Sequence, residues 1–300
     1  MRIGLIDVDG HNFPNLPLMK LSAWHKQRGD EVEWYSHLLA ASGVAKYSRV
    51  YMSKVFTFTP DFPYPICADD VFQGGTGYNL ITKLSQEVEH QFPDYSLYPR
   101  LTENTAFGFL TRGCPRACEF CIVADKEGRK SVKVADLSEF WDGQKEIKLL
   151  DPNLLACDEG DDLLRQLADS GAWVDFTQGL DIRLVDRGRA ELLKTVRTKM
   201  IHFAWDSPKQ DLTGKFRDVK GWLGYDHRKM GVYVLTNFGS THEEDLHRIY
   251  TLRDLGYDPY VMIYDKDNAP KKTRHLQRWA NNKIVFAKCE KFENYDPKIA

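Results

Sequence analysis

Apolar positions along the chain alternate between short runs typical of buried strands and longer stretches with helical spacing. In the first part of the chain, the pattern predicts strands at 2–7, 31–35 and 49–58, a helix at 16–28 and a loop at 59–70. Val71 and Phe72 then lead into the glycine-rich segment 73–77. Strands that alternate with a helix favour a layered α/β unit. We therefore expect residues 1–95 to form a small Rossmann-like open-sheet domain.

After a connector at 92–104, which contains proline and tyrosine, one strand–helix unit recurs six times. The apolar runs expected to be strands are 106–110, 147–150, 173–177, 200–205, 232–235 and 260–264. Amphipathic stretches between them predict helices, for example at 161–168, 190–196 and 243–255. Parallel strands joined by right-handed crossovers curl, so six units predict a partial (βα)6 TIM-like barrel. The second domain is expected over 96–300, with a C-terminal helical extension.

Composition places the chain among ordinary globular proteins. Of its 300 residues, 42% are hydrophobic and 28% charged, and the net charge is −2, so the chain as a whole is not a polycation for nucleic acids. No apolar run approaches the roughly 18 residues that span a bilayer, and the N-terminus lacks the features of a signal peptide. We therefore expect a cytoplasmic protein without membrane contact. In a reducing compartment its six cysteines are expected to be thiols or metal ligands.

Three of those cysteines follow the strand expected at 106–110. Cys114, Cys118 and Cys121 have the spacing C-x3-C-x2-C within eight residues. A tight loop of this kind can ligate three irons of an iron–sulfur cubane and leave the fourth iron open to a small molecule. The alternative is a zinc site, which normally has four ligands and a C-x2-C pair on each side. Here only one C-x2-C pair exists.

The cysteine spacing, with the aromatic Phe120 just before the last cysteine, resembles the signature of the radical S-adenosylmethionine superfamily. The predicted six-unit barrel is similar to that superfamily's fold. The resemblance implies a 4Fe–4S cluster whose open iron is chelated by S-adenosylmethionine. It also implies reductive cleavage of that cofactor to a 5′-deoxyadenosyl radical, which abstracts hydrogen from a substrate. A reductase or a flavodoxin- or ferredoxin-type protein would donate the electron, and the substrate itself cannot be read from the sequence.

Polar residues follow the predicted strands at their carboxyl ends, where barrels of this type bind ligands. The resemblance implies that Phe120 packs on the adenine. Asp151 stands where many relatives have a Gly-Gly-Glu stretch that receives the ammonium of S-adenosylmethionine, although an Asp-Pro-Asn turn explains it equally well. The further cofactor-binding candidates are Asn153, Gln178, Asp181, Arg183, Asp206 and Asn237. For Asp181 and Asp206, capping of the next helix is the alternative.

The segment Asp9-Gly10-His11 partly resembles the D-x-H-x-x-G stretch of cobalamin-binding domains, in which the histidine ligates cobalt. The glycines at 74–77 are similar to the loop that approaches the corrin in those domains. Pro14 replaces the last glycine of the stretch, and 95 residues are few for such a domain. A degenerate domain that binds no cobalamin and a cobalamin-dependent radical S-adenosylmethionine methyltransferase therefore both stay open.

Residues 270–283 contain five basic residues and no acidic one. These basic residues could contact nucleic-acid phosphates. The preferred interpretation is that they form the solvated face of a helix that buries Leu276 and Trp279. The function expected from a different class is a non-catalytic zinc or nucleic-acid binding module. The sequence gives no catalytic base.

Overall fold

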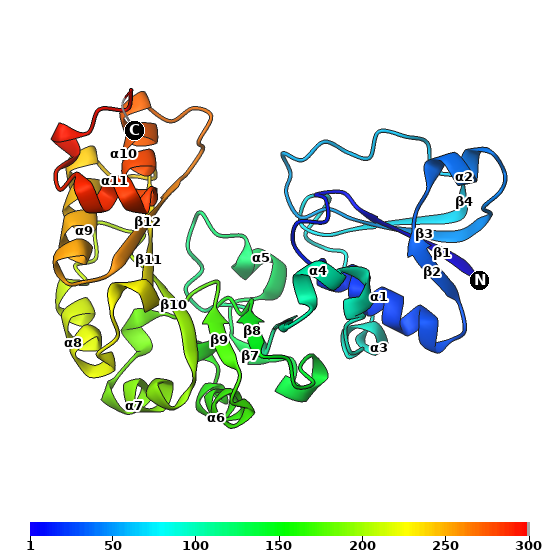
Figure 1. The fold of residues 1–300 in the computed structure, drawn as a ribbon, viewed down its shortest axis with the longest axis horizontal. Coiled ribbons are helices and arrows are strands. Elements are labelled where there is room, and N and C mark those ends of the chain that lie inside the picture. Colours follow the sequence, from blue (N-terminus) through cyan, green and yellow to red (C-terminus); the bar gives the residue numbers. More distant parts are fainter. Residues whose placement is uncertain (299–300) are drawn as a thin grey trace.

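The computed structural model describes residues 1–298, which form an α/β fold around two separate parallel sheets (Figure 1). The first sheet has the strand order β2-β1-β3-β4. Its strands are β1 (Arg2–Asp7), β2 (Glu31–Trp34), β3 (Tyr47–Ser53) and β4 (Ala68–Gly74). The small open sheet expected at the start of the chain is confirmed.

Helices lie on both faces of this sheet. Helix α1 (Leu16–Gln27) begins where the Asn15 side chain accepts a hydrogen bond from the Leu18 N–H, and it packs on Ile3 and Leu5 of β1. The short α2 (His37–Ala41) contributes to an apolar cluster on the opposite face. Together these contacts bury the two faces of β1.

Two predicted boundaries in this part of the chain are wrong. The third strand ends at Ser53 instead of residue 58, because the backbone N–H groups of Val55 and Phe56 turn toward the Asp9 carboxylate and leave the sheet. The loop expected to reach residue 70 gives way to β4 at Ala68, where parallel pairing with β3 begins opposite Tyr47. Sheet pairing across distant residues decides both boundaries.

The connector consists of short helical segments that join the two sheets: α3 (Gln86–Glu89), a 3-10 turn at Tyr95–Leu97 and α4 (Pro99–Thr102). Tyr98 donates a hydrogen bond to Asp7 at 2.8 Å and lies in one buried cluster with Leu16 and Met19 of α1. The same cluster includes Phe107 from the first strand of the second sheet. Apolar packing therefore crosses the boundary predicted near residue 95.

The second sheet has six parallel strands in the order β12-β11-β10-β9-β8-β5. They are β5 (Thr105–Gly108), β8 (Glu146–Leu149), β9 (Trp173–Phe176), β10 (Thr198–Ala204), β11 (Met230–Thr236) and β12 (Asp258–Ile263). All six expected strands are present, and β5 and β12 form the two edges of an open sheet. Because all six strands are parallel, their carboxyl ends lie together along one side of the sheet, called here the carboxyl edge.

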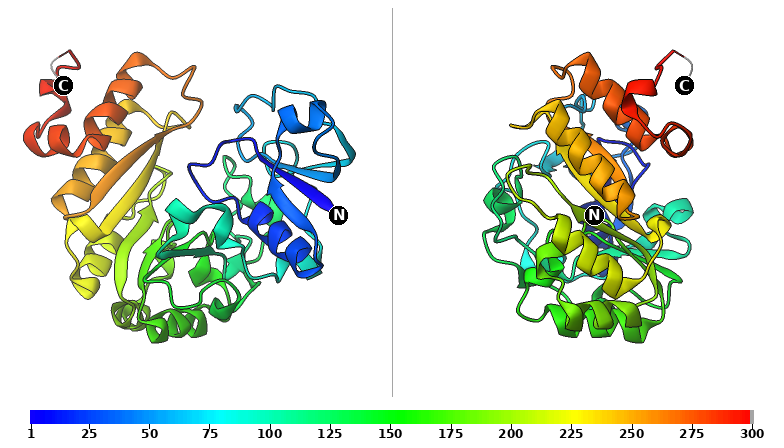
Figure 2. Two further views of the ribbon diagram at one scale, coloured as in Figure 1. Left: turned by 45° about the vertical axis from the view of Figure 1, so that its right-hand side comes forward. Right: turned by 90° about the vertical axis from the view of Figure 1, so that its left-hand side faces the viewer.

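Helices follow the strands and cover one face of the second sheet (Figures 1 and 2). They are α6 (Gly160–Ser170), α7 (Arg187–Thr195), α8 (Thr213–Leu223), α9 (His242–Asp254) and α10 (Lys271–Asn281). Alternate strand residues, such as Ile147, Val174 and Ile201, are completely buried in this layer. The main hydrophobic core lies between the sheet and these helices.

The opposite face of the second sheet, called here the open face, carries side chains that are only partly buried. Lys148, Asp175, His202, Tyr233 and Tyr260 project from five adjacent strands, one from each of β8 to β12. Parallel sheets are normally covered on both faces by apolar layers. Titratable and aromatic side chains in this position indicate a surface that is kept accessible.

The C-terminal extension packs against the edge strand β12 through α10 and the short α11 (Lys283–Lys288). As expected, Leu276 and Trp279 are completely buried while Lys271 and Arg274 are exposed. The basic residues thus line the solvated side of an amphipathic helix. Within residues 1–298, no helix is both long and apolar enough to cross a bilayer.

Candidate functional site

The three clustered cysteines lie on one loop, Gly113–Cys121, called here the cysteine loop. It follows the two-residue strand β6 (Thr111–Arg112), which pairs with β7 (Val132–Lys133). Gly113 has φ +84°, and a Cβ there would clash with the Lys130 carbonyl, so only glycine fits. The Cys114 N–H donates to the Gly128 carbonyl at 3.1 Å, and the Cys121 N–H to the Cys118 carbonyl at 2.9 Å. Backbone hydrogen bonds therefore hold the loop, one within it and one to the segment that follows it.

A buried carboxylate holds the chain that leads into the loop. Asp151 accepts hydrogen bonds from the N–H and hydroxyl of Thr111 at 2.5 and 2.7 Å, and from the Leu110 N–H at 3.1 Å. Burial raises the pKa of Asp151 to about 6, although these hydrogen bonds oppose the shift. Both oxygens are occupied, so in this structure Asp151 positions the cysteine loop.

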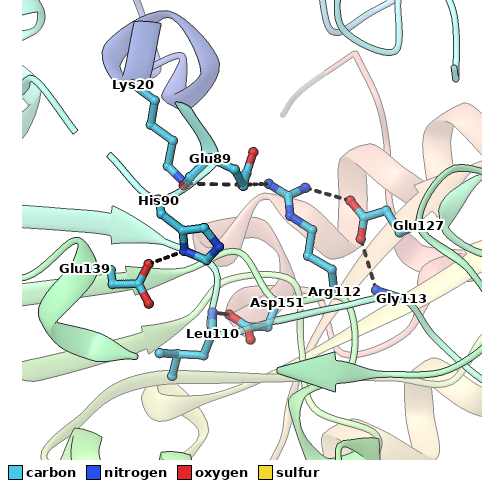
Figure 3. A network of polar contacts seen from close by, with 9 residues as sticks. All are labelled: Lys20, Glu89, His90, Leu110, Arg112, Gly113, Glu127, Glu139 and Asp151. Carbon is cyan, nitrogen blue, oxygen red and sulfur yellow. Dashed lines mark hydrogen bonds and ion pairs between the residues drawn. The ribbon is translucent and has the colours of Figure 1, made fainter. Parts of the chain in front are cut away.

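A second set of charged groups also holds this segment (Figure 3). Glu127 accepts the Gly113 N–H at 3.2 Å and an Arg112 guanidinium bond at 2.9 Å. Arg112 also lies 3.4 Å from Glu89, which pairs with Lys20 of α1 at 3.2 Å. The network links the cysteine loop to the first sheet's helix.

The three thiols are partly buried and lie near one another. Burial raises the pKa values of Cys118 and Cys121, and the charges of Asp206 and the neighbouring thiols act in the same direction. Within residues 1–298, no group of three or more His, Cys, Asp or Glu side chains is arranged so that it could hold a metal ion. The donors fit an iron–sulfur cluster in chemistry and spacing, while their thiols are not set in ligand geometry.

The cysteine loop contacts the carboxyl ends of several strands. Asn153, after β8, donates a hydrogen bond to the Cys114 sulfur at 3.5 Å. Arg116 lies 3.9 Å from Asp181, which follows β9. The ring of Phe120 meets that of Phe238, after β11, edge-on with centroids 5.6 Å apart. The loop therefore lies across the edge of the sheet where the sequence predicts the cofactor residues.

The Asn153 side chain has one unsatisfied polar atom beside Cys114. Only 3% of this residue is exposed, and its Oδ1 is buried without a hydrogen-bond partner. Leaving a buried acceptor unpaired costs about 1–3 kcal/mol. A donor supplied by a ligand would remove this cost, which makes Asn153 the best-placed of the predicted cofactor residues.

Asp181 has the capping role that was its alternative. Its carboxylate accepts the Arg183 N–H at 3.1 Å and the Arg183 Nε–H at 2.6 Å, and it begins the 3-10 turn Ile182–Leu184. Arg183 also donates to the Gln210 side chain at 2.9 Å. Gln178 is exposed on the preceding turn. Contacts of these side chains with a nucleoside stay a prediction.

For Asp206, the capping alternative is wrong, because α8 begins at Thr213 with Leu212 at its N-cap position. Asp206 instead lies largely buried among charges: burial raises its pKa to about 6, while Arg248 and Arg183 oppose the shift. Its charge reaches Cys118. Asp206 is therefore one of the charged groups that act on the thiols of the cysteine loop.

Arg248 is a functional candidate that the sequence analysis missed. It is 1% exposed and donates to the carbonyls of Trp205 and Leu235 at 2.6 and 2.9 Å and to Asp245 at 2.5 Å. These bonds tie the carboxyl ends of β10 and β11 together beside Asp206. In the sequence it is one more charged residue of an amphipathic helix, so no signal distinguishes it.

Residues with strained backbone conformations lie in the cysteine loop and near the carboxyl ends of the strands. Among residues 1–298, the non-glycine residues with positive φ are Ala117 at 45°, Asn237 at 61° and Asp265 at 50°. Ala117 lies in the cysteine loop, Asn237 directly follows β11, and Asp265 lies two residues after the end of β12. Asn237, a predicted cofactor residue, donates to the Tyr264 carbonyl at 2.8 Å. Such strain is typical of functional sites.

The features that resemble a cobalamin site have local explanations. The His11 ring packs edge-on against Trp34 at 4.2 Å between centroids. A Cβ at Gly75 or Gly77 would clash with Lys54, so these glycines allow a close approach of the chain to itself. Asp9 is occupied with the loop after β3. None of these contacts requires a corrinoid.

In comparisons with known proteins, no family model matches the chain. No curated protein matches it either. The case for a function therefore depends on this chain's own residues and geometry.

Proposed function

We propose that the chain is a radical S-adenosylmethionine enzyme in which Cys114, Cys118 and Cys121 hold a 4Fe–4S cluster. The bound cluster and S-adenosylmethionine would together supply reductive cleavage of the sulfonium and hydrogen abstraction from a substrate. The observation that carries the proposal is the position of the three-thiol loop across the carboxyl ends of β8, β9 and β11. The open six-stranded sheet is accordingly proposed to be a partial (βα)6 barrel.

The surrounding residues receive distinct roles in this proposal. Asn153 offers its unpaired Oδ1 to the ammonium of S-adenosylmethionine, a role first expected for Asp151. Asp151 instead fixes the start of the cysteine loop through Leu110 and Thr111. Phe120 covers the adenine. The roles of Asn153 and Asp151 follow from the polar atoms that are free or occupied around the loop, and that of Phe120 from the resemblance of the cysteine motif.

The strand-end residues complete the cofactor site in the proposal. Asp181 and Arg183 are held rigidly by one another and border the ribose and carboxylate, with Gln178 and Asn237 on adjoining turns. Asp206 acts on the cysteines through its charge, with its carboxylate largely removed from water. A reductase or a flavodoxin- or ferredoxin-type partner would deliver the electron.

Anaerobic reconstitution with iron and sulfide tests the proposal. The parent chain should retain about four irons and four sulfides, as a 4Fe–4S cluster requires, and produce 5′-deoxyadenosine with dithionite and S-adenosylmethionine. Cys118→Ala should lose both properties, whereas Cys157→Ala, a buried cysteine outside the loop, should keep them. Zinc without sulfide in the parent, or undiminished 5′-deoxyadenosine from Cys118→Ala, would reject the proposal.

The same preparations separate the alternatives. Stoichiometric binding of added cobalamin, seen as corrinoid absorbance that remains after gel filtration, would favour the cobalamin-dependent methyltransferase. His11→Ala is the matched variant, since His11 is the residue expected to ligate cobalt. We expect no retained absorbance in either protein, because the His11 ring packs against Trp34 and the glycine loop against Lys54.

A further inference from the structure

The two parallel sheets are open, and their edge strands β12, β5, β2 and β4 carry backbone groups that point away from the sheet. At β12, the Val261 N–H donates to Asn281 at 2.8 Å, and the Val261 carbonyl accepts from Asn281 and Gln277 at 3.0 and 3.1 Å. At β5, the Tyr95 hydroxyl accepts the Phe107 N–H at 3.1 Å and lies 3.4 Å from the Phe107 carbonyl. Side chains therefore satisfy outward backbone groups at both edges of the second sheet.

The two edges of the first sheet, β2 and β4, differ in length and protection. β2 has four residues and carries Glu31 and Glu33, and short charged edges resist pairing with other strands. β4 has seven residues and pairs with β3 without a bulge. Residues 69–73 of this strand are all exposed, Val71 and Phe72 by 44% and 45%. β4 is therefore the longer and the less protected of the two edges.

The backbone of β4 presents three residues to the outside. The Lys54 N–H donates to the Gly74 carbonyl at 3.0 Å, so Gly74 and every second residue before it point toward β3. The residues between them, Asp69, Val71 and Gln73, point away from β3. In the part of the chain that the structure describes, the N–H and C=O groups of these three residues have no hydrogen-bond partner. The outer edge of β4 is thus ready to pair with a further strand.

A second copy of β4 matches this edge. In an antiparallel pair, every second pair of opposite residues exchanges two N–H···O=C bonds. With a two-fold axis at Val71, Val71 pairs with Val71 of the second copy, and Asp69 pairs with Gln73 of the second copy. All the outward backbone groups of the strand are then bonded. The Asp69 carboxylate also faces the Gln73 amide, which can donate to it.

The order of charges along β4 selects this register. Asp69 and Asp70 are the only charged residues of the strand. With the axis at Val71, Asp70 lies opposite Phe72 of the second copy, so no carboxylate faces another. A slide by two residues either brings Asp70 opposite Asp70 or moves Asp69 past the end of the partner strand, and each slide loses one bonded pair. Like charges directly opposite each other are destabilising, so the two-fold register at Val71 is favoured.

Apolar side chains add contact on both faces of the paired strands. Val71 lies directly against its counterpart on one face. On the other face the Phe72 ring stacks on Tyr51 with centroids 5.2 Å apart. Its counterpart in the second copy occupies the diagonal position, about 7–8 Å away and within reach of an aromatic ring. Pairing therefore covers the two exposed apolar residues of the edge together with its backbone.

We infer that this chain forms a two-fold dimer through antiparallel pairing of β4 with β4 of a second copy. The two four-stranded sheets join into one continuous sheet. The cysteine loop lies on the second sheet, so each copy keeps its own loop. The inference therefore stands apart from the proposed function.

Sedimentation velocity of the purified full chain, without added iron, tests the dimer. We expect a species of twice the mass of one chain whose share rises with concentration. Val71→Lys places two cations against each other at the axis and should weaken association at least about tenfold. Val44→Lys makes the same change at a valine that is 70% exposed in the same sheet domain, and should leave association unchanged. A monomer at every concentration, which would leave the edge to a strand of another protein, or equal weakening by the two variants would overturn the inference.

Two charge variants test the register. Gln73→Glu places a carboxylate opposite Asp69 of the second copy and should weaken the dimer severalfold. Adding Asp69→Lys to Gln73→Glu makes opposite charges face each other, so the double variant should recover the parent's association. A double variant that associates no better than Gln73→Glu alone would count against pairing at Val71.

Amide hydrogen exchange in the parent protein decides the matter even if the variants fail to fold. The outward N–H groups of Asp69, Val71 and Gln73 should become protected as the concentration rises. Those of Asp70 and Phe72 point toward β3 and should show little change. Exchange of the three outward amides that stays independent of concentration would overturn the inference.

Discussion

Asp151→Asn offers the sharpest test of how the cysteine loop is positioned. The substitution keeps the side chain's size and one acceptor oxygen, which can retain the two bonds from Thr111. Its amide NH₂ then faces the Leu110 N–H, which loses its acceptor in a fully buried place. An unsatisfied buried donor costs about 1–3 kcal/mol, and we expect a loss of stability of that size.

The effect should depend on pH in a direction that the structure fixes. Burial raises the pKa of Asp151 from 3.8 to about 6, so the folded state holds the proton more tightly than the unfolded state. This gives a stability contribution of about 3 kcal/mol that is fully present below pH 3.8 and is lost as the pH rises through 6. About 1 kcal/mol of it is lost between pH 5 and 7. Asparagine does not titrate, so the variant lacks this change.

Urea unfolding at pH 5 and pH 7, followed by circular dichroism, measures the difference. We expect Asp151→Asn to be more destabilising at pH 5 than at pH 7 by about 1 kcal/mol. Raised pKa values of Asp7 and Asp206 affect parent and variant alike and cancel in the comparison. The exposed Asp169→Asn is the control and should stay within about 0.5 kcal/mol of the parent. An equal or larger loss at pH 7 would refute the reasoning.

Two further substitutions probe the frame of the site. Gly113→Ala places a Cβ against the Lys130 carbonyl at a backbone φ of +84°, which strains the start of the cysteine loop. Iron retention after reconstitution should therefore fall severalfold. Retention equal to the parent's would contradict the claim that only glycine fits at this position. Arg248→Met leaves Asp245 without its buried cation and should cost about 3–5 kcal/mol in urea unfolding. Arg228→Met, at an exposed pair, is its control and should cost far less stability than Arg248→Met; equal losses in the two variants would count against the role of Arg248.

The strands of the second sheet could be predicted because each is a run of apolar residues between helical segments. The same logic places Asp181, Asp206 and Asn237 at the carboxyl edge, where the structure has them. The start of β4 could not be predicted, since pairing with β3 decides it and Ala68–Gly74 has little apolar character of its own. The local pattern of apolar residues therefore predicts which strands and helices form, while pairing between distant strands decides where each strand begins and ends.

The roles of individual site residues were harder to predict than their positions. Asp151 lies at the expected strand end, yet both of its oxygens are occupied by the segment 40 residues earlier in the chain. Arg248 lies within an exposed-looking helical pattern, and only the tertiary structure shows it buried between two strand ends.

Electron paramagnetic resonance of the reconstituted, dithionite-reduced protein tests the central claim most directly. The account predicts the signal of a reduced 4Fe–4S cluster, altered in shape when S-adenosylmethionine is added and missing from Cys118→Ala. A reduced parent protein without any paramagnetic signal, or with one that S-adenosylmethionine leaves unchanged, would contradict the assignment of the cysteine loop.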